Sequence, residues 1–300
     1  MPTVAIVAGV AGETNDDIAG AWRGLGLDAV SLPAAGCRDR LSAGDTALGR
    51  YDVRRSLDGV EPGLLELLEL ARRGITVLNP PAALLRAHDK LLTARQFAAA
   101  AVPHPATVHV APGDPLPSLL PPVVVKPRFG SWGSDVALCN SWTELRAQFR
   151  AIADRPWFVR QGALVQTLVP PTGHDLRVLV AGGRVVGAVA RVAAPGEWRT
   201  NVTLGGKFRS AVASPRARTL AIAAARAVRA DLVGIDLLPC NGDYVVIEAN
   251  GCVDFDECYS LPGRNVYRDI AVALGLLPAS DLRVAAPTRL PIAVAAAVGP

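Results

Sequence analysis

The sequence predicts a mixed protein of α/β and α+β type, in which a parallel sheet near the N-terminus is followed by antiparallel hairpins. Two observations support this prediction. Between Thr3 and Leu78, short apolar β-rich runs alternate with stretches of helical periodicity, which is typical of a mostly parallel sheet. Further along the chain, Gly182-Gly183 and Asn241-Gly242 each separate two apolar runs, as the turns of β-hairpins do.

Composition restricts the class of protein. The chain has 300 residues, of which 50% are hydrophobic and 19% charged, so it has material for a large core and is not disordered. We expect two or three small domains at this length. Apolar runs such as Pro121–Val125 and Pro291–Val298 are shorter than the ~20 residues of a membrane span. The N-terminus also lacks the basic start of a secretory signal, so a cytoplasmic protein is expected.

The charged residues argue against a nucleic-acid groove. The net charge is +4, but the arginines are spread evenly and alternate with Asp and Glu. Lysine is rare among the 31 basic residues and occurs only at Lys90, Lys126 and Lys207. These positions are therefore candidates for places where a compact ammonium on a flexible stem is needed instead of a planar guanidinium.

The cysteines give no sign of a metal or redox site. They are scattered, and no two of them have C-x-x-C spacing. We expect reduced residues of the core. The five are Cys37, Cys139, Cys240, Cys252 and Cys258.

The N-terminal elements have local boundary signals. A helix follows Thr14 and ends at Gly24, and a second opens at Glu61-Pro-Gly and closes at Gly74. Gly9 and Gly12 form only half of a dinucleotide fingerprint, so this loop is interpreted as a plain strand-to-helix turn. Strands are expected at Thr3–Ala8, Ala29–Leu32, near Thr46–Val53 and at Ile75–Leu78.

The rest of the chain continues with further punctuated elements. A proline-rich stretch, Val102–Pro122, indicates a junction between domains. Helices are expected at Asp89–Ala101, after the capping box Ser141-Trp-Thr-Glu144, and from Pro215 to Arg229. Strands are expected at Val123–Lys126, Asp135–Cys139, Ala163–Val169, Asp175–Val180, Val185–Val192, Gly234–Leu238 and Tyr244–Ala249.

A strand that ends in Lys126 leads into a loop of small residues, Gly130-Ser-Trp-Gly133, followed by Ser134. Glycines let backbone N–H groups approach phosphate oxygens, and a lysine on the adjacent strand adds positive charge. The segment is not a Walker A loop. A glycine turn beside a surface lysine is the alternative.

Acidic and amide side chains occur in two apolar strands joined by the Asn241-Gly242 turn. Glu248 and Asn250 lie two positions apart and so share a face, which Asp236 on the paired strand can also share. Three hard oxygen donors on one face suit Mg²⁺. A solvated sheet face is the alternative.

A third group combines Asp175-Leu-Arg177 with a long polar loop that contains Arg199 and Asn201. Arginine, asparagine and glycines in such a loop suit the binding of anionic intermediates. An ion-paired loop without a ligand explains the same residues.

Taken together, these motifs resemble a known family over residues 3 to 275. The motifs are His-Asp-Lys90-Leu, Lys126 before Gly-Ser-Trp-Gly, Val165-Gln166, Asp175-Leu-Arg177, Arg199-Thr-Asn201, Gly234-Ile-Asp236 and Glu248-Ala-Asn250. In this order and approximate spacing they resemble the ATP-grasp carboxylate–amine ligases, and among them the RimK-like alpha-L-glutamate ligases. The Gly-Ser-Trp-Gly loop is most similar to the LysX-like branch, which adds amino acids to the C-terminal glutamate of an amino-group carrier protein in lysine and arginine biosynthesis.

The resemblance implies an architecture and a set of site residues. It implies a Rossmann-like domain at residues 1–86, a first ATP-grasp lobe at 87–165, a second lobe with the metal site at 166–285, and a tail at 286–300. ATP would lie between the lobes. Phosphates would contact Lys90, Lys126 and the loop residues Ser131, Trp132 and Gly133, and adenine would contact the backbone of Gln166, Thr167 and Leu168. Asp175 would lie near the nucleotide, Arg199 and Asn201 would act at the transferred phosphoryl group, and Asp236, Glu248 and Asn250 would bind Mg²⁺, with two ions expected and Mn²⁺ as an alternative.

The implied activity is amide or peptide bond formation. A carboxylate takes the γ-phosphoryl group of ATP, and an amine then displaces phosphate. The expected partners are a small molecule, peptide or carrier protein with a carboxylate, plus an amine donor such as glutamate, with no nucleic acid, no membrane, and a homo-oligomer left open. A nucleotide-binding regulator without turnover is the main alternative, and a dinucleotide-dependent oxidoreductase is the least favoured.

Two departures from the family pattern concern the substrates. Thr167 stands where many relatives have glutamate, which matters little if the adenine contacts are made by the backbone. Relatives tend to follow the metal-binding asparagine with Ser-Pro-Gly, whereas Asn250 here leads into a loop with Asp254, Asp256 and Glu257. These acids suit a cationic or amine-bearing acceptor, although a solvated charge run is equally compatible with them.

Overall fold

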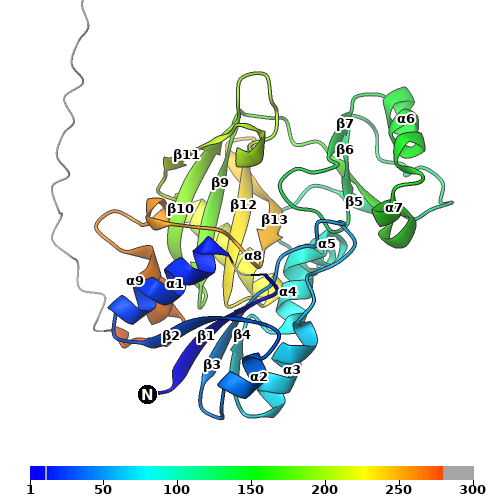
Figure 1. The fold of residues 1–300 in the computed structure, drawn as a ribbon. Helices are drawn as coiled ribbons and strands as arrows, with labels where there is room; N and C mark the ends of the chain where they lie inside the picture. Colours follow the sequence, from blue (N-terminus) through cyan, green and yellow to red (C-terminus); the bar gives the residue numbers. More distant parts are fainter. Residues whose placement is uncertain (11, 280–300) are drawn as a thin grey trace, which may run out of the picture.

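The computed structural model describes residues 1–10 and 12–279, and the predicted tail at 286–300 lies outside them. Three sheets organise the fold (Figure 1). The first has the order β2-β1-β3-β4, the second β5-β8-β6-β7, and the third β11-β10-β9-β12-β13. The mixed α/β and α+β prediction is therefore confirmed.

The first sheet is parallel, as predicted, because β1 pairs in parallel with both β2 and β3, and β3 pairs in parallel with β4. The strand expected near Thr46–Val53 is β3, which ends earlier, at Arg50, so that Asp52 lies in the following loop. The elements are β1 (Thr3–Ala8), α1 (Glu13–Gly24), β2 (Asp28–Pro33), α2 (Cys37–Arg40), β3 (Thr46–Arg50), α3 (Leu64–Arg72) and β4 (Thr76–Leu78).

The helix predicted from Asp89 is confirmed as α5 (Lys90–Ala99), and a helix that was not predicted, α4 (Pro81–His88), directly precedes it. They meet at Asp89, whose side chain accepts hydrogen bonds from the backbone N–H groups of Leu91 and Leu92. Although α5 falls within the predicted first lobe, it packs against α8 and against β13 of the third sheet as well as against β5 of the second.

The second sheet forms a small lobe. Its strand β5 lies inside the proline-rich junction, and β8 spans the predicted boundary between residues 165 and 166. The strand expected from Asp135 starts only at Ala137, because Asp135 has a left-handed φ of 54° and its carboxylate binds Arg155 and Trp157. The elements are β5 (Thr107–Val110), β6 (Val123–Pro127), β7 (Ala137–Cys139), α6 (Trp142–Ile152), α7 (Pro156–Gln161) and β8 (Ala163–Thr167).

The third sheet is antiparallel and contains both predicted hairpins. The helix α8 packs against β9, β12 and β13. The sequence did not predict β11 or α9. The elements are β9 (His174–Ala181), β10 (Arg184–Val192), the 3-10 turn η1 (Val202–Leu204), β11 (Lys207–Ser210), α8 (Pro215–Val228), β12 (Leu232–Cys240), β13 (Asp243–Asn250), the 3-10 turn η2 (Glu257–Tyr259) and α9 (Val266–Ala273).

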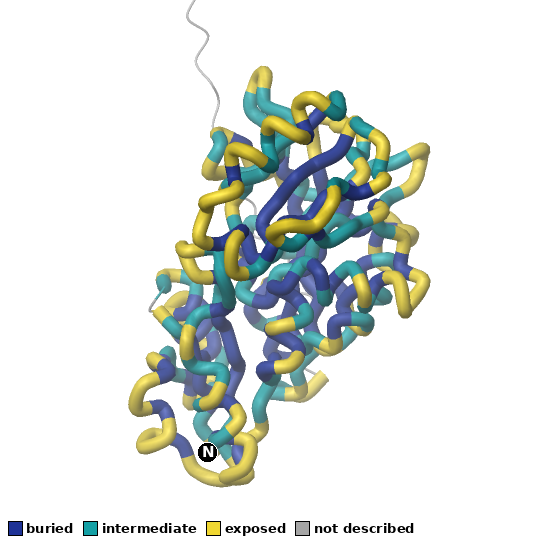
Figure 2. Tube along the Cα trace, turned by 90° about the vertical axis from the view of Figure 1, so that its right-hand side faces the viewer, coloured by how far each residue is buried: buried dark blue, intermediate teal, exposed yellow. Residues whose placement is uncertain are grey.

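The first and third sheets share a hydrophobic core. Ile6 and Trp22 belong to the same buried cluster as Leu179 and Val189, and the Trp22 indole Nε1 donates to the Tyr267 carbonyl at 3.0 Å. The small lobe has a separate core around Leu145. Figure 2 shows the buried segments in the interior of the molecule and the exposed segments mainly in the peripheral loops. The N-terminal domain and the large lobe, which is built on the third sheet, therefore form one packed body.

The cysteine prediction is only partly confirmed. All five cysteines are free, but only Cys37 and Cys139 are buried, while the other three are half-buried. Among the described residues, no helix is both long enough and apolar enough to cross a membrane.

Candidate active site

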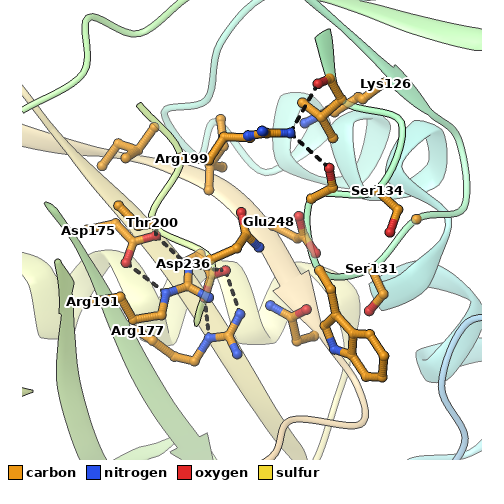
Figure 3. Close-up of a pocket in the computed structure, with 18 of the residues that line it drawn as sticks. Lys126, Ser131, Ser134, Asp175, Arg177, Arg191, Arg199, Thr200, Asp236 and Glu248 are labelled. Carbon is orange, nitrogen blue, oxygen red and sulfur yellow. Dashed lines mark hydrogen bonds and ion pairs between the residues drawn. The ribbon is translucent and has the colours of Figure 1, made fainter. Parts of the chain in front are cut away.

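A cavity of about 440 Å³ lies where strands of the second and third sheets face each other, and every site residue predicted from the sequence lines it. Figure 3 shows part of its wall. The predicted residues are Lys90, Lys126, Ser131, Trp132, Gly133, Gln166, Thr167, Leu168, Asp175, Arg199, Asn201, Asp236, Glu248 and Asn250.

Lys126 is the last residue but one of β6 and is a buried cation, with 6% of the residue exposed. Its Nζ donates to Oε1 of Gln166 at 2.8 Å, and Nε2 of Gln166 donates to the Thr107 hydroxyl at 2.8 Å. Burial lowers the pKa of Lys126 to about 8, with Lys90 adding to the shift and Glu248 opposing it. The Gln166 side chain thus orients a lysine that the cavity has largely removed from water.

Lys90 occupies the first turn of α5, directly after the Asp89 cap. Its Nζ donates to the Gly130 carbonyl at 2.5 Å and lies 3.4 Å from Oε1 of Glu248. Arg128 holds the cap through two hydrogen bonds to Asp89, of 2.7 and 2.5 Å. The helix start is therefore fastened to the segment after β6, which brings Lys90 to the glycine loop.

A row of charged side chains crosses the cavity-facing side of the third sheet. The strand register places Arg191 beside Asp175, Asp236 beside Arg177, and Glu248 beside Asp236. These residues therefore come together from four neighbouring strands, as the alternation of side chains along a strand requires.

The arginines of this row are bound to its aspartates (Figure 3). Arg177 makes a bidentate pair with Asp236, with N···O distances of 2.7 and 2.8 Å. Arg191 pairs with Asp175 and also reaches Asp236 at 2.8 Å, while the Thr200 hydroxyl donates to Asp175 at 2.6 Å. Burial would raise the pKa of Asp236, but the two arginines outweigh it and lower this pKa to about 2. Both oxygens of Asp175 are engaged, so its role in the structure is to position Arg191 and Thr200.

The predicted metal ligands have the donor chemistry for Mg²⁺. Asp236 accepts three hydrogen bonds from the arginines, which leaves about one of its roughly four lone-pair positions. With its amide oriented to suit its neighbours, Asn250 donates to Glu248 at 3.1 Å and accepts from Arg177 at 3.3 Å. In the described part of the chain, no group of three or more His, Cys, Asp or Glu could hold a metal by itself. Two carboxylates and an amide fit Mg²⁺ when phosphate oxygens complete its coordination.

Two loops form the wall above this row. In the glycine loop, Trp132 and Gly133 have left-handed φ angles of 58° and 75°, and a Cβ on Gly133 would lie 3.0 Å from Oδ1 of Asn201. Arg199 donates to the Gly133 carbonyl at 3.2 Å, and Glu197 holds its guanidinium at 2.9 and 3.0 Å. A side chain at position 133 would crowd Asn201, so the close approach of the two loops favours glycine there. Arg199 bridges the two loops.

The segment after β8 borders the other end of the cavity. The Thr167 N–H donates to the Ala106 carbonyl at 2.9 Å, and the Leu168 N–H donates to the Pro122 carbonyl at 3.2 Å. Backbone contacts from this segment to a base would therefore use its carbonyls or the Val169 N–H.

Sequence reasoning missed several polar cavity residues, among them Arg191, Thr200 and Asp52. Arg191 belonged to no motif, Thr200 stood inside the Arg199-Thr-Asn201 motif without a role, and Asp52 follows the third strand of the parallel sheet. Its signal was an acid placed just past a β-run, at the carboxyl edge where α/β sheets bind ligands. Among the acids singled out in the loop after Asn250, Asp254 lines the cavity, whereas Asp256 and Glu257 line a separate surface hollow.

Burial dominates the electrostatics around Asp52. It raises the pKa of Asp52 to about 6, and the nearby carboxylates of Glu61 and Asp254 add to the shift. His88 lies 3.9 Å away, but burial and the charge of Lys90 lower its pKa to about 3, so that it is neutral at pH 7.

Comparison with known proteins agrees with this geometry. A family model described as RimK-like ATP-grasp domain matches residues 101–274. A probable alpha-L-glutamate ligase of Xanthomonas campestris pv. campestris is 34% identical over 210 residues, which cover 68% of this chain and 71% of that protein. A probable alpha-L-glutamate ligase of Pseudomonas fluorescens is 28% identical over 210 residues, covering 68% of each.

Solved structures show the same fold. D-alanine–D-alanine ligase from Bacillus anthracis complexed with ATP has a TM-score of 0.67 at 13% identity, covering 91% of this chain and 95% of that one. A RimK domain ATP-grasp protein from Sphaerobacter thermophilus has a TM-score of 0.64 at 19% identity, covering 91% and 99%. Enzymes of this family bind ATP, typically with Mg²⁺. The chain belongs to the RimK-like ATP-grasp family and is a ligase that forms carbon–nitrogen bonds.

Proposed function

We propose that this ligase activates a substrate carboxylate as an acyl phosphate and couples it to an amine. A carboxylate oxygen attacks the γ-phosphorus of ATP and ADP leaves; the amine nitrogen then attacks the acyl carbon, phosphate leaves, and the amine gives a proton to solvent. One observation carries the proposal: Lys90 and Lys126 line the same cavity as Glu248 of the charged row, and both lysines lie within range of its charge. Phosphoryl transfer depends mainly on such positioning and charge neutralisation.

The residues then have distinct roles. Lys90 and Lys126 hold the phosphates, and the backbone N–H groups and hydroxyls of the glycine loop, with Ser131 and Ser134, cover them. Arg199, with Asn201 beside it, stabilises charge on the transferred group. Glu248 and Asn250, with the remaining lone pair of Asp236, hold Mg²⁺, for which two ions are expected and Mn²⁺ is the alternative. The metal supplies charge neutralisation to the phosphates.

The substrates we propose are an amine donor such as glutamate and a peptide, a carrier protein or a small metabolite that carries the carboxylate. Support comes from the relatives named as probable alpha-L-glutamate ligases. Glutamate itself is the least supported part, because the loop after Asn250 departs from the pattern of the family.

The first test is Mg²⁺-dependent ADP release with pooled L-amino acids and acidic peptides, with Glu248→Gln as the blank. We expect turnover in one pool and a loss of at least about 100-fold in the variant, since a phosphate-side metal ligand is removed. ATP binding without turnover in any pool would contradict an amino acid or small peptide as the carboxylate substrate and would favour an unsupplied protein partner or a nucleotide-binding regulator.

A further inference from the structure

The carboxyl edge of the N-terminal parallel sheet opens into the active-site cavity. In the strand order β2-β1-β3-β4, the chain moves from β1 to β2 in one direction and then from β2 past β1 to β3 in the other, so the switch point lies between β1 and β3. Open α/β sheets bind ligands outside the carboxyl ends of the strands at such a point. Asp52, two residues after β3, lies at this switch point and lines the cavity.

Two further carboxylates border this place. Oε2 of Glu61 accepts a hydrogen bond from the Asp52 N–H at 3.1 Å, and a Cβ on Gly9 would lie only 2.7 Å from that oxygen. Asp254 comes from the large lobe, lines the same cavity, and accepts from the Thr14 hydroxyl at 3.0 Å. Two chain segments, the connection from β3 to α3 and the loop after β13, thus place three acids near the switch point, and the glycine that follows β1 makes room for Glu61.

Among the described residues, Asp52 forms no ion pair with a lysine or an arginine, although the charge of Lys90 lies close enough to lower its pKa slightly. Lys90 is engaged with the Gly130 carbonyl and with Glu248. Arg50 lies 3.8 Å from Asp254 and is bound to other partners, and His88 is neutral. Asp52 accepts one hydrogen bond, from the Val53 N–H at 2.7 Å. The Asp52 side chain is 28% exposed and lines the cavity with no lysine or arginine bound to it, so this end of the cavity is suited to a positively charged group of a ligand.

We propose that Asp52, assisted by Asp254, binds the primary ammonium group of the amine substrate and selects for it. This inference rests on the proposed function, because it concerns the second substrate of the same reaction. The cavity then has two ends of opposite character: the lysines receive the phosphates, and Asp52 receives the substrate cation. The substrate class is a primary amine that is protonated at neutral pH, such as an amino acid. Its ammonium gives one proton to solvent before the nitrogen attacks the acyl carbon, and the nitrogen loses a second proton as the amide forms and phosphate leaves.

The test separates carboxylate activation from amine binding. Hydroxylamine, which is uncharged at neutral pH, traps an acyl phosphate as a hydroxamate without needing an ammonium site. Wild type and Asp52→Asn are compared in hydroxamate formation and in ligation, with the common L-amino acids supplied as a pool and then singly. We expect Asp52→Asn to raise the KM for the amine by about 10- to 100-fold, the range for loss of a charge-assisted hydrogen bond. Hydroxamate formation and the KM for ATP should stay within about twofold.

Two variants complete the experiment. Asp52→Glu keeps the charge and should restore most of the amine affinity. Asp243→Asn removes an exposed carboxylate that is paired with Arg216 and does not line the cavity, and it should leave every parameter unchanged.

The outcomes are distinguishable. An unchanged amine KM in Asp52→Asn, or equal loss of hydroxamate formation and ligation in it, would overturn the role of Asp52 while the ligase function stood. Absence of hydroxamate from wild type in every pool would overturn the proposed function, and this inference with it.

Discussion

Lys126 is a cation that the fold has almost removed from water. Its hydrogen bond to Gln166 keeps the ammonium in place, and burial lowers its pKa to about 8. An ammonium kept this dry gains more from an arriving phosphate than an exposed one would, because screening by water is weak there. Its protonation should therefore control ATP capture in the free enzyme.

That control predicts a pH dependence. Lys126 is charged below about pH 8 and neutral above it, so kcat/KM for ATP should fall as pH rises through 8, by up to about tenfold per unit. Lys126→Arg keeps its charge at these pH values, so its profile should be flat there, from a lower starting value. Steady-state kinetics from pH 6 to 10 check this, with Lys207→Arg, on the exposed β11, as control. Parallel profiles for wild type and Lys126→Arg would refute the assignment.

The stability linked to Lys126 has the opposite sign. Its folded pKa of about 8 lies below the ordinary lysine pKa of 10.5, so between these pH values the unfolded chain binds more protons. Stability from this group therefore rises with pH across that window, while ATP capture falls. Stability and ATP capture thus change in opposite directions with pH, because both depend on the protonation of a lysine that burial destabilises in its charged form.

At the scale of elements, α5 shows how a cap positions a functional side chain. The Asp89 carboxylate accepts hydrogen bonds from two backbone N–H groups of the first turn and forms an ion pair with Arg128. Lys90 directly follows Asp89 in the chain. The capping interactions satisfy N–H groups that the helix itself leaves free. The same contacts fix the start of the helix against the glycine loop.

Asp89→Ala should therefore impair both stability and ATP binding. We expect a loss of about 3 kcal/mol in the free energy of unfolding, because the cap and a buried ion-pair partner disappear together. The KM for ATP should rise about tenfold as Lys90 loses its anchor. Ser141→Ala removes the cap of α6, and should cost about 1 kcal/mol with no change in the KM. Denaturant unfolding and kinetics test both; an unchanged KM in Asp89→Ala would contradict the coupling.

At the scale of the whole molecule, hydrophobic packing divides the chain into one large body and the small lobe. The N-terminal domain and the large lobe share a core through α1 and α9, whereas the small lobe has its own. The cavity lies at the boundary between these two bodies and collects side chains from both. The small lobe can therefore open locally without disrupting the shared core.

Two core truncations should distinguish these bodies. Trp22→Ala should cost about 3 to 5 kcal/mol and weaken hydrogen-exchange protection in both β1 and β10, because the cluster is common to them. Leu145→Ala should cost about 2 to 5 kcal/mol but weaken protection in the small lobe alone. Hydrogen exchange with mass spectrometry reads out each strand. A Trp22→Ala effect confined to the N-terminal sheet would contradict a shared core.

The sequence by itself determined most of the elements and many of the polar residues that line the cavity. Apolar periodicity and turn residues are local signals, so the parallel sheet and both hairpins could be predicted. Glu248 and Asn250 follow from strand alternation, which fixes a shared face without any distant contact. The scarcity of lysine drew attention to Lys90 and Lys126, and both line the cavity.

Only the tertiary structure decided how these side chains are used. Asp236 is bound by two arginines from other strands, Asp175 positions Arg191, and Gln166 orients Lys126. Asp52 enters the cavity because the N-terminal sheet packs against the large lobe and turns its carboxyl edge inward. Such pairings join residues far apart in the chain, and their strength depends on burial. Neither strand register between distant segments nor the loss of water is encoded in local spacing, so the fold alone could assign these partners.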